Sequence, residues 1–203
     1  MMNLLVLFLF SYLHSVRISD TMLSAMKYEI TDITYEINNE SFGVHTVHKI
    51  RALKDFGDVK KGDLGGWIEG KINLSQVGNC WVYDDSIVFG TGGIIDDATV
   101  SGHSIVYGHS HIGNSAKICG GSTVKHTSVD GHALVDSKSI TSYSNISDNA
   151  VVKNSSIQSS EINGNAYLNN SYACACTIGG NVVVWNANIS EVKCDGNEEI
   201  FRK

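Results

Sequence analysis

The chain has 203 residues, no proline, a net charge of −6 and a sequence pI of about 5.7. This length fits one domain with a substantial core, and the acidic balance argues against the basic face that direct binding of nucleic acid needs. The five cysteines are an odd number in a long domain, which argues against a disulfide framework.

Residues 1–25 differ from the rest of the chain. Leu4 to Phe10 is an unbroken apolar run that is too short to span a bilayer. Three interpretations stay open for residues 1–25: an extension upstream of the real start, an apolar cap, or a signal or anchor. We expect a cytoplasmic protein with no membrane span, or a secreted one if residues 1–25 act as a signal.

Residues 26–70 predict a β-rich segment. Apolar and polar residues alternate over 27–37, and a second strand is expected over 44–53, where Val44, Val47, Ile50 and Leu53 are apolar. A turn at 38–43 joins the two strands into a hairpin. Residues 55–70 are rich in glycine and indicate loops.

A spacing of six governs Asn79 to Val129. Eight apolar residues follow one another at this spacing: Val82, Val88, Ile94, Val100, Val106, Ile112, Ile118 and Val124. A small residue stands two positions before each of them, and a turn-forming residue stands two positions after most of them. No helix has a period of six, whereas a short strand followed by a turn fits all three positions. The pattern predicts a single-stranded left-handed β-helix with three hexads in each triangular coil, so that positions 18 apart stack. The hairpin segment would then cap the open end of this solenoid.

Beyond Val129 the apolar spacing alternates between five and six. The apolar positions expected to point inward are Val135, Ile140, Ile146, Val152, Ile157, Ile162, Leu168, Cys174, Ile178 and Val184. The β-helix is therefore expected over residues 71–192 with uneven corners. Residues 193–203 are charged and predict a tail or short end-cap.

Several runs in the first half match a known family. They are Lys49–Asp58, Val59–Glu69, Asn73–Gln76 and Gly78–Val82, followed by hexads. Together they resemble the YdcK-type β-helix proteins of bacteria and phages over about residues 27–190. The resemblance implies a left-handed β-helix like that of hexapeptide-repeat acyltransferases, a transferase label and a phage or prophage association. A fold does not establish chemistry.

Catalytic candidates are few. Enzymes with these repeats typically use a histidine base and a long loop that closes an acyl-donor groove in a trimer, and Asn79 to Val129 holds no insertion. Asp85 stands 18 positions before His103 and could orient its imidazole, although we expect the two to be structural neighbours. His109 and His126 are weak candidates for a metal site, because polar corners also favour histidine. We expect no metal and no cofactor.

The outward positions carry a cluster of large apolar residues. They are Trp81, Tyr83, Ile87, Phe89, Ile105 and Tyr107. Such a cluster needs a cover, which is either residues 1–56 of the same chain or an interface with a second copy or a protein partner.

These observations favour a non-enzymatic binding or structural module. The alternative is an acyl-CoA-dependent acyltransferase that uses a coenzyme A thioester as a trimer. A weaker alternative is an acidic β-helical inhibitor of a nucleic-acid enzyme.

Overall fold

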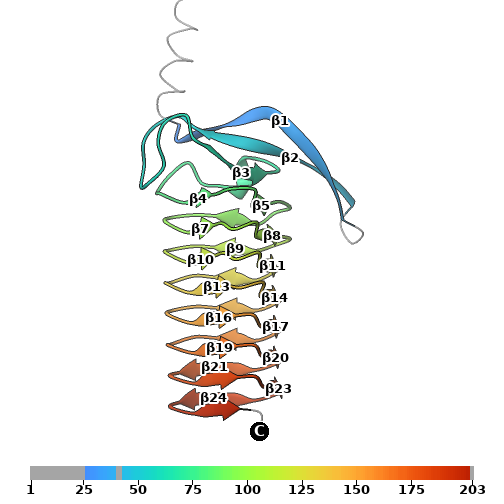
Figure 1. The fold of residues 1–203 in the computed structure, drawn as a ribbon, viewed down its shortest axis with the longest axis vertical. Coiled ribbons are helices and arrows are strands. Elements are labelled where there is room, and N and C mark those ends of the chain that lie inside the picture. Colours follow the sequence, from blue (N-terminus) through green and yellow to red (C-terminus); the bar gives the residue numbers. More distant parts are fainter. Residues whose placement is uncertain (1–25, 40–42, 202–203) are drawn as a thin grey trace, which may run out of the picture.

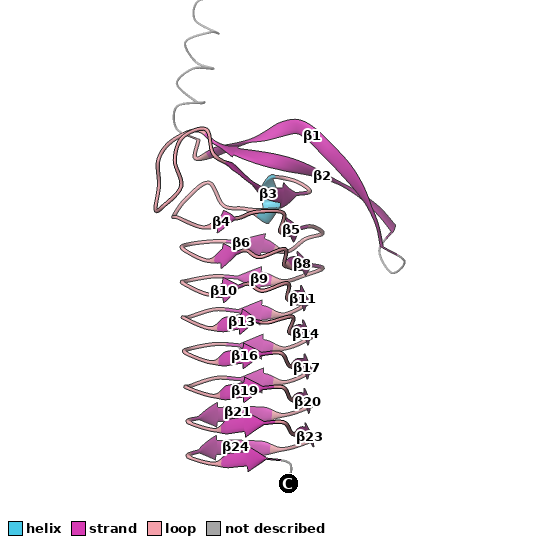
Figure 2. Cartoon of the chain, viewed as in Figure 1, coloured by secondary structure: helices cyan, strands magenta, loops and turns pink. Residues whose placement is uncertain are grey.

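The computed structural model describes residues 26–39 and 43–201, which form a tall stack of short strands beneath a long hairpin (Figure 1). The stack is a left-handed β-solenoid of about eight turns, as the hexads predict. Apart from one short 3₁₀ helix, η1 (Lys71–Asn73), the described residues are strands, turns and loops (Figure 2). Within the described residues, no helix is long and apolar enough to cross a bilayer.

Three sheets run along the stack. The first face contains β1 (Tyr28–Asn39), β2 (Gly43–Ala52), β3 (Leu64–Ile68), β5 (Ile87–Val88), β8 (Ile105–Tyr107), β11 (Thr123–Lys125), β14 (Ile140–Ser142), β17 (Ser156–Gln158), β20 (Tyr172–Cys174) and β23 (Asn188–Ser190). The second face contains β4 (Trp81–Val82), β7 (Thr99–Val100), β10 (Lys117–Ile118), β13 (Leu134–Asp136), β16 (Val151–Lys153), β19 (Tyr167–Asn169), β22 (Val183–Trp185) and β25 (Glu199–Phe201). The third face contains β6 (Gly93–Ile94), β9 (His111–Ile112), β12 (Ser128–Val129), β15 (Asn145–Ile146), β18 (Glu161–Ile162), β21 (Thr177–Gly180) and β24 (Lys193–Gly196).

The coil shortens along the chain. Ile87 pairs with Ile105, three full hexads further on. The coil has lost one residue where Thr123 pairs with Ile140, and a second where Ile140 pairs with Ser156. The corners explain this change, because residues with positive φ recur at 143, 148, 154, 159, 164 and 170. Their steps of five, six and five repeat from coil to coil, so the second half of the chain is as regular as the first.

This register corrects two of the expected inward positions. Thr141 rather than Ile140 pairs with Val124 inside the coil, and Ile140 is 54% exposed. Ala173 likewise takes the place expected for Cys174. The reason is that each inward side chain must stack on the one below, and the coil length sets which residue that is. One consequence is that the hydroxyl of Thr141 is buried without a hydrogen-bond partner among the described residues.

Buried serines close the corners on the inside. The Oγ of Ser86 accepts a hydrogen bond from the backbone N–H of Ser104, and the Oγ of Ser104 accepts one from the backbone N–H of Ser122, each at 3.2 Å. Because these two hydroxyls each accept from a backbone N–H of the next coil, such small polar side chains can be buried at little cost.

The hairpin caps the first coil, as expected. β1 and β2 pair antiparallel, and the Tyr28 hydroxyl donates to the Leu74 carbonyl at 2.6 Å. The Lys27 ammonium donates to the Cys80 carbonyl at 2.8 Å. These bonds join the start of the cap to residues of the first coil that lie far along the chain.

Residues 193–201 continue the solenoid, so the tail expected from residue 193 is not present there. Cys194 pairs with Ile178 and Ile200 pairs with Val184, each extending an inward apolar position into the last coil. Residues 1–25, expected as an apolar extension, and residues 202–203 lie outside the described residues.

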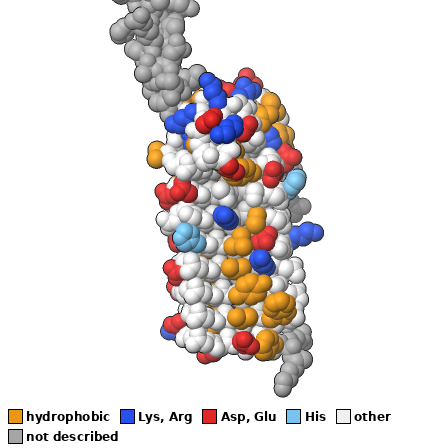
Figure 3. Space-filling model, turned by 60° about the vertical axis from the view of Figure 1, so that its left-hand side comes forward, with side chains coloured by type: hydrophobic (Ala, Val, Ile, Leu, Met, Phe, Trp, Pro, Cys, Tyr) orange, Lys and Arg blue, Asp and Glu red, His pale blue; other side chains and the backbone are white. Residues whose placement is uncertain are grey.

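The outward side chains of the second face are largely apolar over the lower coils (Figure 3). Leu134, Val151, Tyr167 and Val183 follow one another from strand to strand. The hexads did not predict this column, because its members follow the shortened coil.

Candidate functional site

Asp85 connects the coil to the cap. Its Oδ1 accepts hydrogen bonds from the Lys49 ammonium at 2.8 Å and the Trp67 indole N–H at 3.2 Å. The bonds from Lys49 and then Trp67 hold the pKa of Asp85 below its ordinary value, and the charge of His103 adds the smallest effect. His103 lies at an exposed corner with a φ of 61°. Asp85 therefore has two structural partners, and a catalytic role for the pair stays a prediction.

His109 and His126 form a stack with Tyr143. The two imidazole centroids lie 5.4 Å apart, and the His126 and Tyr143 rings lie 4.9 Å apart. The backbone N–H of His109 donates to Nδ1 of His126 at 3.1 Å, so this nitrogen is an acceptor and its lone pair is in use. Burial, then the nearby His109 and Lys125, lowers the pKa of His126.

This stack lines a groove of about 760 Å³ that also contains Glu161 and Cys176. Within residues 26–39 and 43–201, no three histidine, cysteine, aspartate or glutamate side chains come together to hold a metal ion. The two histidines stack as rings rather than converging on one point. A metal role for them stays a prediction.

The six apolar residues expected on the outer face divide into two groups. Trp81 is 1% exposed and packs against Tyr28 and Phe56, and Phe89 is 2% exposed and packs against His45. These two side chains are therefore buried by the chain's own cap, which was one of the two covers considered, and they are not open interface positions.

The other four residues are partly exposed or bonded to the cap. Tyr83 donates its hydroxyl hydrogen to Asp58 at 2.5 Å, and Ile87 pairs with Trp67 of β3. Ile105 and Tyr107 lie one coil below, where the Tyr107 ring stacks on Phe89 with 5.1 Å between the ring centroids. An interface role for these residues stays a prediction.

A histidine–glutamate pair between cap and coil was missed from the sequence. Nδ1 of His45 lies 2.9 Å from Oε1 of Glu69, and the backbone N–H of Gly90 donates to Oε2 of Glu69 at 2.7 Å. Burial alone would raise the pKa of Glu69, but these two hydrogen bonds outweigh it and leave the pKa below its ordinary value. Nε2 of His45 is buried without a hydrogen-bond partner among the described residues. Only the cap geometry brings the two side chains together, and no local sequence pattern relates them.

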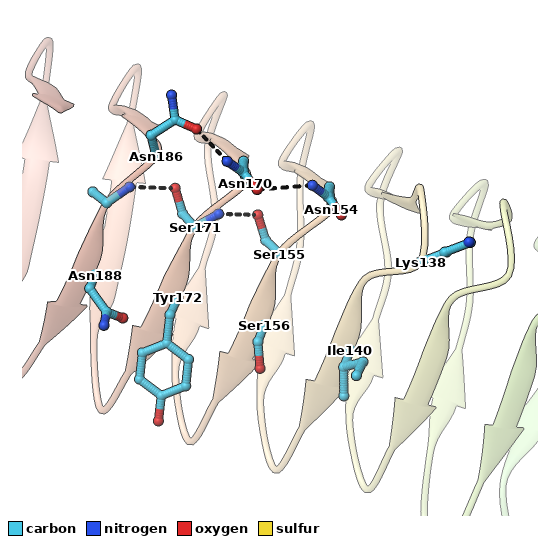
Figure 4. Close-up of a pocket in the computed structure, with 11 residues that line it drawn as sticks. Lys138, Ile140, Asn154, Ser155, Ser156, Asn170, Ser171, Tyr172, Asn186 and Asn188 are labelled. Atoms are coloured by element: carbon cyan, nitrogen blue, oxygen red, sulfur yellow. Dashed lines mark hydrogen bonds between the residues drawn. The ribbon is translucent and has the colours of Figure 1, made fainter. Parts of the chain in front are cut away.

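A polar groove of about 480 Å³ follows the corner that leads into the lower strands of the first face (Figure 4). A column of asparagines forms one edge: Asn154 donates its amide to Asn170 at 3.0 Å, and Asn170 donates to Asn186. Tyr172 and Ile140 point outward from β20 and β14 beside this column.

The floor of the groove is held by hydrogen bonds between coils. The backbone N–H of Ser171 donates to the Ser155 hydroxyl at 3.1 Å, and that of Ala187 donates to the Ser171 hydroxyl at 3.2 Å. Each asparagine of the edge uses at most one N–H and one oxygen lone pair along its column, which leaves a second donor and acceptor for a ligand. The signal in the sequence is the regular spacing of the asparagines, which becomes visible only once the coil length is known.

Comparison with known proteins supports the resemblance over part of the chain. No family model matches. Among curated proteins the chain is similar to the "Uncharacterized acetyltransferase YdcK" of Escherichia coli (strain K12), with 41% identity over 63 residues. The match covers 30% of this chain and 19% of that protein. The similarity to YdcK-type proteins indicated by the sequence is thus confirmed over the matched segment, and the solenoid is the fold expected from it.

Proposed function

We propose that the protein is a non-enzymatic β-helical binding module whose asparagine groove takes a neutral, hydroxyl-rich ligand such as a glycan chain. The observation that carries the proposal is the lining of the groove, which combines amides, hydroxyls and an exposed tyrosine and has no carboxylate among the described residues. Amides can both donate to and accept from hydroxyl groups, and the tyrosine adds an apolar face with a polar tip. The phage association is part of this proposal and rests on the resemblance alone.

The groove extends along the solenoid over several coils, which favours a chain-like ligand. The asparagine column repeats at the strand spacing of about 4.8 Å over three coils. Lys138 is the one charged side chain among the described residues that line the groove. A ligand of high negative charge would meet little positive potential there, which favours a neutral one.

Binding to a panel of neutral polysaccharides tests the proposal. We expect Tyr172→Ala and Asn170→Ala to weaken binding at least about tenfold, the effect of losing one well-placed contact. Asn165→Ala is the matched control, because Asn165 belongs to a separate asparagine column with Asn149 and Asn181. Binding that is absent, or that the groove variants leave unchanged, contradicts the proposal.

An acyltransferase is the second candidate. The His45–Glu69 pair favours it, because a carboxylate that accepts from Nδ1 leaves the lone pair of Nε2 to act as a general base. Nε2 is buried beneath the cap, so a substrate hydroxyl or amine would reach it only when the cap opens. The name of the E. coli relative points the same way. The acyl donor would be a coenzyme A thioester. Release of free thiol from acetyl-coenzyme A that is lost in His45→Ala and retained in His103→Ala would establish this function in place of the first.

A further inference from the structure

Over the last six strands of the second face, one column of outward residues has a nearly palindromic order of side-chain types. From β10 to β25 these residues, the outer column, are Lys117, Leu134, Val151, Tyr167, Val183 and Glu199. A cation stands at one end, an anion at the other, and four apolar side chains lie between them. The pairing is in register through all six strands.

This column is complementary to the same column of a second copy whose solenoid axis runs in the opposite direction. Two copies can pack second face to second face about a twofold axis parallel to the strands. Such an axis keeps the strand direction and turns the stack upside down, so the outer column of one copy faces the outer column of the other. Lys117 then faces Glu199 of the second copy, Leu134 faces Val183, and Val151 faces Tyr167.

The neighbouring outward positions tolerate this arrangement. They form the trailing column, which includes Asp136, Lys153, Asn169 and Trp185. In the antiparallel pair Lys153 faces Asn169 of the second copy, and Asp136 faces Trp185, whose indole N–H can donate to a carboxylate. Asp136 also has Lys153 of its own chain 3.9 Å away. Among these four positions no charge faces a like charge.

A parallel pair would be unfavourable. A twofold axis along the solenoid sets each outer-column residue against the trailing-column residue of the same strand. Leu134 would then face Asp136, and Val151 would face Lys153. Apolar side chains would cover charged ones without replacing their hydration. The charge pattern thus selects the antiparallel arrangement.

The geometry points to an antiparallel homodimer through the outer column of the second face. Trp185 is 44% exposed and Phe201 is 60% exposed beside this column, so the single chain leaves large apolar groups there for a second copy to cover. None of the ion pairs within residues 26–39 and 43–201 involves Lys117 or Glu199. This inference is independent of the ligand proposed for the groove.

The size of the contact sets the expected strength. Six strands about 4.8 Å apart give a contact roughly 24 Å long, and three side chains across give roughly 10 Å of width. This is smaller than the ~800 Å² that each partner of a standard interface buries, so we expect a weak dimer. Its dissociation constant should lie in the range of about 10–500 μM, as for transient complexes.

Charge reversal tests both the dimer and its register. Sedimentation velocity over a concentration series should show a monomer–dimer equilibrium for the unmodified chain. Lys117→Glu and Glu199→Lys should each weaken it about tenfold or more, because like charges then face each other twice in the dimer. The double variant K117E/E199K should restore it, since the pair is re-formed with its signs exchanged.

Lys193→Glu and Glu161→Lys are the matched controls, because they change the net charge equally at exposed positions on the third face. We expect both to dimerise like the unmodified chain. A chain that stays monomeric at all concentrations, or one that forms a trimer, overturns the proposal. A double variant that fails to recover overturns the antiparallel register, and loss of dimer in the controls overturns the specific pairing in favour of a general charge effect.

Discussion

Thr141 offers the most direct test of the register inside the coil. Its side chain is fully buried in an apolar column between Val124 and Ile157, and its hydroxyl has no hydrogen-bond partner among the described residues. Thr141→Val replaces that hydroxyl with a methyl group of similar size. Because leaving a buried hydroxyl unsatisfied costs about 1–3 kcal/mol, we expect the variant to recover part of this cost, about 1–2 kcal/mol in the free energy of unfolding.

Thermal unfolding measures this change. For a chain of this size, about 1 kcal/mol corresponds to a shift of about 2–4 °C in Tm, so Thr141→Val should melt about 2–8 °C higher. Thr127→Val is the matched control with the opposite sign. The Thr127 hydroxyl donates to the Lys125 carbonyl at 2.8 Å and accepts from the Ser144 N–H at 3.4 Å. Removing this hydroxyl leaves the buried N–H of Ser144 without its acceptor and should destabilise the protein by about 1–3 kcal/mol.

An aspartate pair separates this register from the one expected from the hexads. Thr141→Asp buries an unpaired carboxylate and should cost several kcal/mol, whereas Ile140→Asp changes an exposed side chain and should stay within about 0.5 kcal/mol. Two results would contradict this register: Ile140→Asp as the damaging change, or a lower melting temperature for Thr141→Val. Either result would show that the pairing of β11 with β14 is wrong by one position.

Three further predictions concern other parts of the solenoid. Val106→Asp places a carboxylate in a fully buried column, so chemical denaturation should show a loss of several kcal/mol. The pKa of Glu69 is lowered, so its hydrogen-bonded carboxylate stabilises the fold above the ordinary glutamate pKa of about 4.5 and loses this effect as the pH falls through the lowered value. The difference in the free energy of unfolding between the unmodified chain and Glu69→Gln should therefore shrink as the pH falls below about 4.5. Burial, and then the hydrogen bond with Asp136, raise the pKa of Cys119 to about 11, so alkylation of this thiol followed by mass spectrometry should be slow at about pH 8 and faster in Asp136→Asn.

The sequence predicts the inward side of this protein well and the outward side poorly. The aliphatic residues from Val82 to Val124 lie at one spacing because each must stack on an aliphatic side chain one coil away, and all of them are buried as expected. The cap hairpin is equally visible, because the alternation over 27–37 and the turn at 38–43 need no knowledge of tertiary contacts. The packing requirement on the inward residue is the same in every coil, so it produces a repeated pattern that can be recognised in the sequence.

Ile140 shows where that reading fails. An isoleucine between loosely spaced apolar residues looks like a core position, yet the coil has lost one residue by then and places threonine inside. The His45–Glu69 pair shows a different failure. Its two members stand in a strand of the cap and beside a turn, and no local pattern relates them. Their contact depends on how the hairpin folds over the first coil.

The shortened coil is what gives the outer surfaces their chemistry. Asn154, Asn170 and Asn186 form one column only because the coils between them are equally long. Lys117 and Glu199 lie at mirror positions only when strands, not residues, are counted from the centre of the outer column.

Corner length should therefore matter more to the outer surfaces than to the core. An extra residue in a corner can bulge outward, which lets the aliphatic column inside keep its stacking, whereas the bulge obstructs any surface that must lie flat against a second molecule. The corner at Asp148 leads directly into β16, whose Val151 stands near the centre of the outer column. A single-residue insertion after Asp148 should accordingly abolish dimer formation in sedimentation velocity while the protein still unfolds cooperatively. An insertion that leaves the dimer intact would contradict this account of the second face.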